Sequence, residues 1–431
     1  MRAWDAERVA AAAGARLVSG RSDGAGPERA VIDSREAGPG DLFVGLVGEH
    51  ADGGSFADGA LAAGAWGVLV APQWADGLDR PGAVLTADAP LAALGMLARA
   101  WRRALAAQAI VVTGSVGKTS TKEVIRALLA PQRAVVASRA NFNTDIGMPL
   151  EILAAPEGTE VLVLEAAMRG FGQIADLARI AEPDVGVITN IGPVHLEQVG
   201  TVEGVARAKA ELLAGMPDGG VAVVPAGEAL LDPYLRPGLR VVTFGPGGDV
   251  AEPPPGLAAE VTAAHQRLNL LAAVAAARAV GVEPAGRVEL APAALRGERI
   301  ELPGGATVVN DCYNASPLSM RAALEDLASN EPAGRRIAVL GDMLELGSRE
   351  LELHREVGEE AGRAGVDVLV TVGPRAAAMR ETFGGESHAV EDAAGAAALV
   401  GELVGPGDLI LVKGSRGVGL EVVAEALEAV R

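Results

Sequence analysis

The segment 109–120 constrains the fold of this chain more than any other part of the sequence. An apolar, strand-like run is followed by the turn Gly114-Ser-Val-Gly-Lys-Thr119 and then by a helical pattern. Glycines in such a turn let backbone N–H groups approach phosphate oxygens, and the N-terminus of the helix adds a partial positive charge. Lys118 can then reach the β- and γ-phosphates of a nucleotide, and the hydroxyl of Thr119 suits Mg²⁺. The alternative is a glycine-rich turn that only caps a helix.

The longer form of this phosphate-binding pattern has a glycine where Val112 stands, so the chain carries the shorter G-x-x-G-K-T variant. The order of strand, loop and helix nevertheless favours phosphate binding. The residues expected to contact the nucleotide at this loop are Gly114, Ser115, Val116, Gly117, Lys118, Thr119 and Ser120.

The alternation of strand and helix patterns predicts an α/β protein of three domains, since 431 residues exceed what one core usually organises. The predicted boundaries are 1–107, 108–296 and 297–431. In the second and third domains, buried strands separated by helices indicate mainly parallel sheets covered on both faces. The strands predicted from apolar runs are 30–32, 42–46, 67–70, 83–86, 109–113, 161–164, 185–189, 221–224, 307–309, 336–340, 367–372 and 408–412; helices are predicted at 91–106 and 269–282, and a loop at 244–256.

Composition excludes several classes of function. The net charge of −19, with no basic run, argues against general nucleic-acid binding, although helix N-termini and a cation can still hold an anionic nucleotide locally. The single cysteine, Cys312, cannot form an internal disulfide, which fits a reducing compartment. The N-terminus lacks the pattern of a signal peptide, and no run approaches the roughly 20 apolar residues of a membrane span. We therefore expect a soluble, cytoplasmic, monomeric protein without nucleic-acid partners or membrane insertion.

Two residues outside the loop, Glu165 and His195, are candidates for a metal site. Glu165 ends one predicted strand and His195 follows another, and the carboxyl ends of parallel strands share one rim of a sheet. A carboxylate and an imidazole at that rim can hold a divalent ion. Taken alone, Glu165 is equally well explained as structural, a single histidine such as His195 after a strand is more often structural than a ligand, and Lys209 resembles a solvated helix lysine.

The loop is accompanied by further motifs in a fixed order along the chain. Together they resemble the Mur ligase family over essentially the whole sequence, and the last four are most similar to those of the family member that adds D-alanyl-D-alanine. No Asp-Asn-Pro-Arg stretch, which reads diaminopimelate in the preceding ligase, is found. The motifs are Asp33-Ser-Arg35, Gly40-Asp-Leu-Phe43, Asp52-Gly53, Asn141-Phe-Asn-Thr-Asp-Ile-Gly-Met-Pro149, Thr189-Asn-Ile-Gly-Pro-Val-His-Leu-Glu197, Ala206-Arg-Ala-Lys-Ala-Glu211, Asp311-Cys-Tyr-Asn-Ala-Ser-Pro317, Leu340-Gly-Asp-Met-Leu-Glu-Leu-Gly347, His354-Arg-Glu-Val-Gly358 and Lys413-Gly-Ser-Arg416.

The resemblance implies a UDP-sugar-binding N-terminal domain, a central ATP-binding domain of P-loop type and a Rossmann-like C-terminal ligase domain. It implies that Lys118, Glu165, His195 and Lys209 are catalytic, and that Thr119, Glu165, His195 and Lys209 organise Mg²⁺, with Lys209 carbamylated. Asn269, Arg296 and Asp311 are implied at the adenosine end, where a capping amide, a surface arginine and a turn carboxylate are the alternatives. Substrate contacts are expected at Ser34, Arg35, Asn141, Asn143, Thr144, Tyr313, Asn314, Lys413 and Arg416.

The implied reaction is the ATP-dependent addition of D-alanyl-D-alanine to UDP-N-acetylmuramoyl-tripeptide, a step of peptidoglycan synthesis in cell-wall formation. The tripeptide carboxylate would form an acyl phosphate, which the dipeptide amine then attacks. The alternatives are another ligase of this superfamily, such as a folylpolyglutamate-type enzyme, and a non-catalytic nucleotide-binding paralogue. Three features differ from the family pattern: Gln266 after His265, Ser316 before Pro317, and a short segment 245–265.

Overall fold

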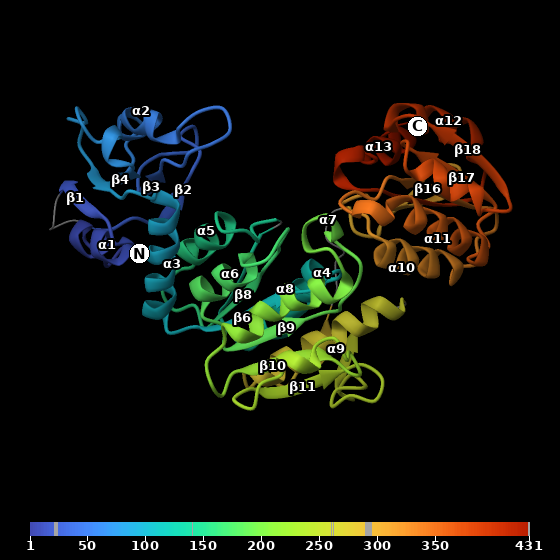
Figure 1. Ribbon diagram of the computed structural model, residues 1–431, viewed down its shortest axis with the longest axis horizontal. Helices are drawn as coiled ribbons and strands as arrows, with labels where there is room; N and C mark the ends of the chain where they lie inside the picture. Colours follow the sequence, from blue (N-terminus) through green and yellow to red (C-terminus); the bar gives the residue numbers. More distant parts are fainter. Residues whose placement is uncertain (21–24, 140, 260, 262, 289–294, 430–431) are drawn as a thin grey trace.

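The computed structural model describes residues 1–431 except 21–24, 140, 260, 262, 289–294 and 430–431. Three separate main sheets follow one another along the chain, one at each end of an elongated molecule and one between them (Figure 1). The prediction of an α/β fold with mostly parallel sheets is confirmed. Because the sheets occupy residues 16–86, 108–244 and 298–413, the boundaries at 107/108 and 296/297 remain a proposal compatible with them.

The N-terminal sheet has the order β1-β5-β4-β3-β2, with β1 antiparallel to β5 and the other neighbours parallel. All residues of β3, β4 and β5 are buried, as expected for strands whose two faces are both covered. The elements are α1 (Ala6–Ala13), β1 (Arg16–Ser19), β2 (Arg29–Val31), β3 (Asp41–Val44), α2 (Ala57–Ala62), β4 (Gly67–Val70), β5 (Ala83–Thr86) and α3 (Pro90–Leu105).

Helix α3 connects the N-terminal domain to the central one, and Trp101 is its main anchor. Its side chain is only 2% exposed, packs edge-on against Trp4 with ring centroids 5.3 Å apart, and donates its indole N–H to Ala155 O at 3.0 Å.

Trp101→Ala is expected to lower the free energy of unfolding by about 3–5 kcal/mol. Trp101→Phe keeps a ring but loses the hydrogen bond, so a smaller loss is expected. Urea denaturation of both variants measures this, and equal stabilities of wild type and Trp101→Ala would contradict it.

The central sheet is fully parallel, with the order β11-β10-β9-β6-β8-β7. Helices α4 and α9 cover one face, whereas α6 and α8 pack on the other. The elements are β6 (Gln108–Thr113), α4 (Lys118–Leu129), β7 (Val135–Ala137), α5 (Gly147–Ala154), β8 (Val161–Glu165), α6 (Gln173–Ala181), β9 (Val185–Ile188), α7 (Leu196–Val199), α8 (Val202–Ala214), β10 (Val221–Pro225), β11 (Arg240–Phe244), β12 (Leu257–Ala259), α9 (Ala264–Ala279) and β13 (Gly286–Val288).

The segment predicted as a loop, 244–256, lies between β11 and β12, and β12 pairs with β13 in a separate two-stranded sheet. The helix predicted at 269–282 is α9, which begins five residues earlier and ends at Ala279. Its residues 269–277 are buried, in agreement with the prediction of a buried helix.

The C-terminal sheet has the order β14-β15-β19-β16-β17-β18 and is parallel except for the pair β14–β15. None of the helices among the described residues has both the length and the apolar composition of a membrane span. The elements are β14 (Glu298–Glu301), β15 (Thr307–Asn310), α10 (Pro317–Ala328), β16 (Arg336–Gly341), α11 (Glu350–Arg363), β17 (Val368–Val372), β18 (Glu386–Val390), α12 (Ala393–Leu403), β19 (Leu409–Lys413) and α13 (Glu421–Ala429).

Candidate active site

A cleft of about 1790 Å³ is lined by residues of both the central and the C-terminal domains. The residues predicted to be catalytic or to bind metal, nucleotide or substrate all line this cleft except Gly114, Lys209, Ser34 and Arg35. Gly114 and Lys209 are buried, and their direct contact is described below. Ser34 and Arg35 lie in the N-terminal domain, where the Arg35 side chain is exposed and paired with Asp33 at 2.5 Å.

Strand register explains why the loop and the candidate metal ligands meet. Strand β6 lies between β8 and β9, with Val112 opposite Glu165 and Thr113 opposite Ile188. The phosphate loop, Glu165 and the segment that leads to His195 therefore leave the sheet at the same rim, as the sequence predicted.

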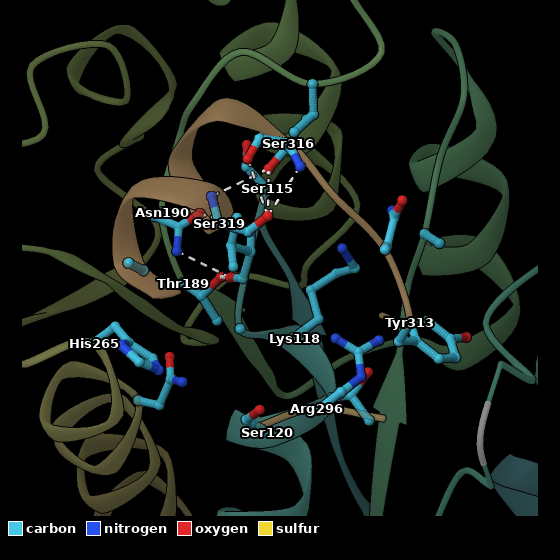
Figure 2. A pocket seen from close by; sticks show the side chains of 18 of the residues that line it. Ser115, Lys118, Ser120, Thr189, Asn190, His265, Arg296, Tyr313, Ser316 and Ser319 are labelled. Carbon is cyan, nitrogen blue, oxygen red and sulfur yellow. Dashed lines mark hydrogen bonds between the residues drawn. The ribbon is translucent and has the colours of Figure 1, made fainter. Parts of the chain in front are cut away.

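The phosphate loop is held in shape by the segment that follows β9. Val116 donates its N–H to the Asn190 side-chain oxygen at 2.9 Å, and Val116 O accepts from Thr189 Oγ1 at 2.6 Å and Asn190 Nδ2 at 2.9 Å. The Ser115 hydroxyl contacts both the carbonyl and the N–H of Gly192, at 3.1 and 2.9 Å. Figure 2 shows Asn190 and Thr189 beside this loop. These bonds fix the loop before any phosphate binds.

Two glycines of the loop have φ values of +147° and +81°, which side-chain-bearing residues rarely adopt. A Cβ at Gly114 would lie 1.9 Å from Thr189 Oγ1, and one at Gly117 would lie 2.5 Å from Asn269 Oδ1. The loop therefore requires glycine both for its backbone conformation and for the close approach of β9 and α9. The second contact also brings Asn269 next to the loop, where the sequence placed it.

Glu165 is almost fully buried, and its carboxylate accepts two side-chain hydrogen bonds. The donors are Thr119 Oγ1 at 2.7 Å and Asn143 Nδ2 at 2.9 Å, while the Glu165 N–H donates to Ser138 Oγ at 3.1 Å. A buried carboxylate without a cation partner is costly unless it is hydrogen-bonded, and these contacts provide that compensation. Thr119 and Glu165 thus place a hydroxyl and a carboxylate at one point of the rim, and such oxygen ligands suit a hard divalent cation.

Lys209 lies behind the loop with only 2% of its surface exposed, and Nζ donates to Gly114 O at 2.8 Å. Lys118 Nζ donates to the same carbonyl at 3.0 Å. Burial, and second the positive charge of Lys118, hold the pKa of Lys209 well below the ordinary value for lysine. Burial is also the first cause of the lowered pKa of Lys118. Because its pKa is lowered, a larger fraction of Lys209 is uncharged than of an ordinary lysine, and the uncharged amine is the form that reacts with carbon dioxide.

His195 precedes α7 in a left-handed conformation with φ +53°, and its Nδ1 contacts a carboxylate oxygen of Glu345 from the C-terminal domain. Burial lowers the pKa of His195, whereas the nearby Glu345 carboxylate acts in the opposite direction. Within the ranges described above, no three His, Cys, Asp or Glu side chains cluster as a metal site. A divalent ion here would therefore need Glu165, His195, Thr119 and further oxygens, such as phosphate oxygens or a carbamate.

The opposite wall combines Arg296, at the boundary of the two domains, with an aromatic ring and further cations of the C-terminal domain. The Arg296 guanidinium lies 4.0 Å from the centre of the Tyr313 ring, and Figure 2 shows it near Lys118 in the pocket. Lys413 is buried, and Nζ donates to Asp311 Oδ2 at 2.6 Å and to the carbonyl of Asn314 at 3.0 Å. Because Lys413 also donates to Asp311 O at 3.3 Å, it stabilises this loop in the present arrangement. Its contact with a substrate carboxylate stays a prediction.

Ser316, which replaces the expected asparagine, is the N-cap of α10 and forms a capping box with Ser319. Gln266 and His265 both line the cleft. Arg416 lines the cleft as well and is paired with Glu421 at 3.2 Å.

Sequence reasoning missed several residues that shape the site. Asn190 and Thr189 lie within a quoted motif, but their bonds to the loop could be inferred only from the pairing of β6 with β9. Glu345 also lies within a quoted motif, but nothing in the sequence indicated that it contacts His195, and Ser138 lies in none of the quoted motifs. A carboxylate next to a proposed metal-binding histidine can be recognised only once the domains are placed together.

Two family models match the chain: the Mur ligase middle domain over residues 112–252, and the Mur ligase, glutamate ligase domain over residues 295–416. UDP-N-acetylmuramoyl-tripeptide–D-alanyl-D-alanine ligase of Bacillus subtilis (strain 168) is 36% identical over 427 residues, covering 92% of each chain. Among solved structures, MurF from Acinetobacter baumannii matches with a TM-score of 0.87, 28% identity and 99% coverage of both chains. MurF ligase from Thermotoga maritima, in complex with ADP, gives a TM-score of 0.81 at 31% identity, covering 93% of this chain and 97% of that one.

The phosphate loop and the cleft between two domains are typical of a nucleotide-binding enzyme, and the matches to family models and relatives show a ligase: the chain belongs to the Mur ligase family. Within that family, relatives from Bacillus subtilis and Escherichia coli, 36% and 33% identical to this chain and each covered to 92%, carry the name of the D-alanyl-D-alanine-adding ligase.

Proposed function

We propose that this chain joins D-alanyl-D-alanine to UDP-N-acetylmuramoyl-tripeptide, the two substrates that the names of its relatives state. The reaction would be driven by the cleavage of ATP to ADP and phosphate at the phosphate loop. One observation carries the proposal: the phosphate loop, Glu165 and His195 line one cleft together with Arg296, at the boundary of the two domains, and Asp311 of the C-terminal domain. A cleft between two domains can bring ATP and two further substrates together and exclude water from an activated acyl group.

In the proposed reaction a tripeptide carboxylate oxygen attacks the γ-phosphorus of ATP, and ADP leaves. The dipeptide amine then attacks the carbonyl carbon of the acyl phosphate, phosphate leaves, and the amine loses a proton as the amide forms. Lys118 and the loop N–H groups would stabilise the charge on the transferred phosphoryl group. The loop residues Gly114, Ser115, Val116, Gly117, Thr119 and Ser120 would hold the phosphates, and Asn269, Arg296 and Asp311 would bind the nucleotide.

Mg²⁺ would be held by Thr119, Glu165 and His195, and bound there it would neutralise charge on the phosphate oxygens. Carbamylation of Lys209 would add an anionic oxygen ligand at the same place. The lowered pKa of Lys209 supports this assignment, since carbamylation requires the uncharged amine. The neighbouring Lys118 would in turn stabilise the anionic carbamate once it has formed.

The remaining substrate contacts are divided among the three domains. Ser34 and Arg35 of the proposed UDP-sugar-binding domain, residues 1–107, would contact the UDP-sugar. Asn141, Asn143 and Thr144 of the central domain, residues 108–296, lie near Glu165 and would face the peptide. Tyr313, Asn314, Lys413 and Arg416 of the ligase domain, residues 297–431, would receive the dipeptide. ATP as co-substrate fits a cytoplasmic enzyme, and a monomer suffices because one chain supplies the entire cleft.

Phosphate release by the purified protein with ATP and Mg²⁺ tests this function, with each of the two substrates supplied singly and together. Release only when both are present, together with the pentapeptide product in the mass spectrum, is expected. ATP binding without release for either a diaminopimelate- or a lysine-containing tripeptide would contradict the assignment. A folylpolyglutamate-type or other ligase, or a non-catalytic paralogue, would then take its place.

A further inference from the structure

The contact between His195 and Glu345 joins the central domain to the C-terminal domain at the edge of the cleft. Both residues line the cleft and both are partly buried, with side-chain exposures of 24% and 34%. An ionised carboxylate can only accept hydrogen bonds, so in the neutral imidazole of His195 the Nδ1–H group donates the hydrogen bond to Glu345. The other ring nitrogen, Nε2, is then the unprotonated one and keeps its lone pair for a metal ion.

The backbone around this contact is unusual on both sides. His195 and Glu345 have φ values of +53° and +61°, which cost energy for residues other than glycine and persist only where the surroundings fix them. A backbone hydrogen bond also joins the two segments, since Glu197 donates its N–H to Glu345 O at 3.4 Å. Arg169 lies 3.8 Å from the second carboxylate oxygen of Glu345.

The loop that presents Glu345 is fixed from within the C-terminal domain. Met343 donates its N–H to His354 Nε2 at 3.0 Å, and Leu344 donates to Ser415 Oγ at 3.0 Å. The buried Asp342 carboxylate accepts from the N–H groups of Arg375 and Ala376, at 3.0 and 2.7 Å. Successive residues before Glu345 are thus anchored to three other segments of the domain, so Glu345 moves as part of that domain.

We propose that Glu345 is a positioning residue for His195, which fixes its tautomer and ring orientation for metal binding when the C-terminal domain takes up this position. Carboxylates that accept the N–H of the ring nitrogen not bound to the metal commonly act in this way on metal-binding histidines. The inference rests on the proposed function, because the metal role of His195 belongs to it. Its consequence is that the metal site is complete only when both domains are in contact, which links cation binding to closure of the cleft.

Binding of Mn²⁺ to the ADP-loaded protein, followed by electron paramagnetic resonance, tests the proposal without turnover. Glu345→Ala is expected to weaken Mn²⁺ binding by about 10-fold or more, with Glu345→Gln in between because the amide oxygen still accepts a hydrogen bond. The apparent KM for Mg²⁺ in the phosphate-release assay should rise in parallel. Glu352→Gln, a change on the same domain at an exposed residue paired with Arg349, is the matched control and should leave both quantities unchanged.

A double-mutant cycle separates action through His195 from a general structural effect. In a His195→Ala background, Glu345→Ala should cause no further loss of Mn²⁺ affinity. If His195→Ala weakens Mn²⁺ binding but Glu345→Ala does not, the positioning role is wrong while the proposed metal site stands. If His195→Ala itself has no effect on Mn²⁺ binding, the metal role of His195 fails, and the positioning role fails with it. Additive losses in the double variant would also overturn the proposal.

Discussion

Replacement of Lys209 by alanine is expected to leave the protein folded and to lower kcat/KM for phosphate release by about 10²-fold or more. Folding should survive because Gly114 O, which accepts a hydrogen bond from Lys209, keeps the one from Lys118. Activity should not survive, since the variant has no amine that can form the carbamate proposed as a metal ligand. Steady-state kinetics and a thermal melt measure the two effects separately.

Two further measurements distinguish a carbamate from a simple positive charge at this position. Lys209→Arg keeps the charge but offers no amine of lowered pKa, so it should be as inactive as Lys209→Ala. Added acetate or formate should restore part of the activity of Lys209→Ala by supplying a carboxylate to the vacated space. Isotopically labelled bicarbonate should give a carbamate signal by NMR in the wild type and none in either variant. An active Lys209→Arg enzyme would contradict the carbamate.

The direction of the pKa shift of Lys209 predicts how the modification responds to pH. Because burial lowers this pKa, the amine is neutral at a lower pH than an exposed lysine and is available to carbon dioxide there. Below the lowered pKa the amine is protonated, so carbamate and activity should decline together as the pH falls.

Lys118→Ala is expected to reduce kcat/KM by about 10³-fold, while ADP binding falls much less. The reason is that Lys118 is the amine of the phosphate loop and would meet charge that develops on the transferred γ-phosphoryl group. The loop itself is held by Thr189 and Asn190, so its shape does not depend on this side chain. Phosphate release and equilibrium titration with ADP provide the two readouts.

Arg133→Ala is the matched control for Lys118→Ala. It removes one positive charge from an exposed pair with Glu160, 3.0 Å apart, outside the cleft. Its kcat/KM should equal that of the wild type. A Lys118→Ala enzyme within about 10-fold of the wild type would show that backbone N–H groups and the metal ion suffice without the amine.

The strands of the three main sheets that were not predicted from the sequence were missed for one physical reason. Each of the three main sheets has two edges, and five of these six edge strands were not predicted; only β2 was. An edge strand such as β18 has just one neighbour and stays partly exposed, so its sequence lacks the continuous apolar run of a central strand. The predicted strands of the central and C-terminal domains lie inside their sheets, where burial on both faces imposes that run. The missed edge strands are β1, β7, β11, β14 and β18.

Parallel-sheet topology also decided how much of the site was predictable. Glu165 and His195 were inferred as site residues because one ends a buried strand and the other follows one. That inference required only that the carboxyl ends of parallel strands lie at the same edge of the sheet. The pairing of Lys413 with Asp311 was not foreseen, although β15 and β19 are parallel neighbours that end side by side. Neither was the contact of His195 with Glu345, because it depends on how two domains are placed and no local pattern encodes that.

The burial of the lysines has a consequence for protein chemistry. The chain contains only four lysines, at positions 118, 122, 209 and 413. Lys122, Lys209 and Lys413 are almost completely buried, and Lys118 lies in the nucleotide loop. The outer surface therefore carries its positive charge on guanidinium groups, and acylating reagents that target amines should leave the folded protein nearly unlabelled. Labelling of Lys118 should then disappear when nucleotide is added, and general labelling should begin only as the protein unfolds.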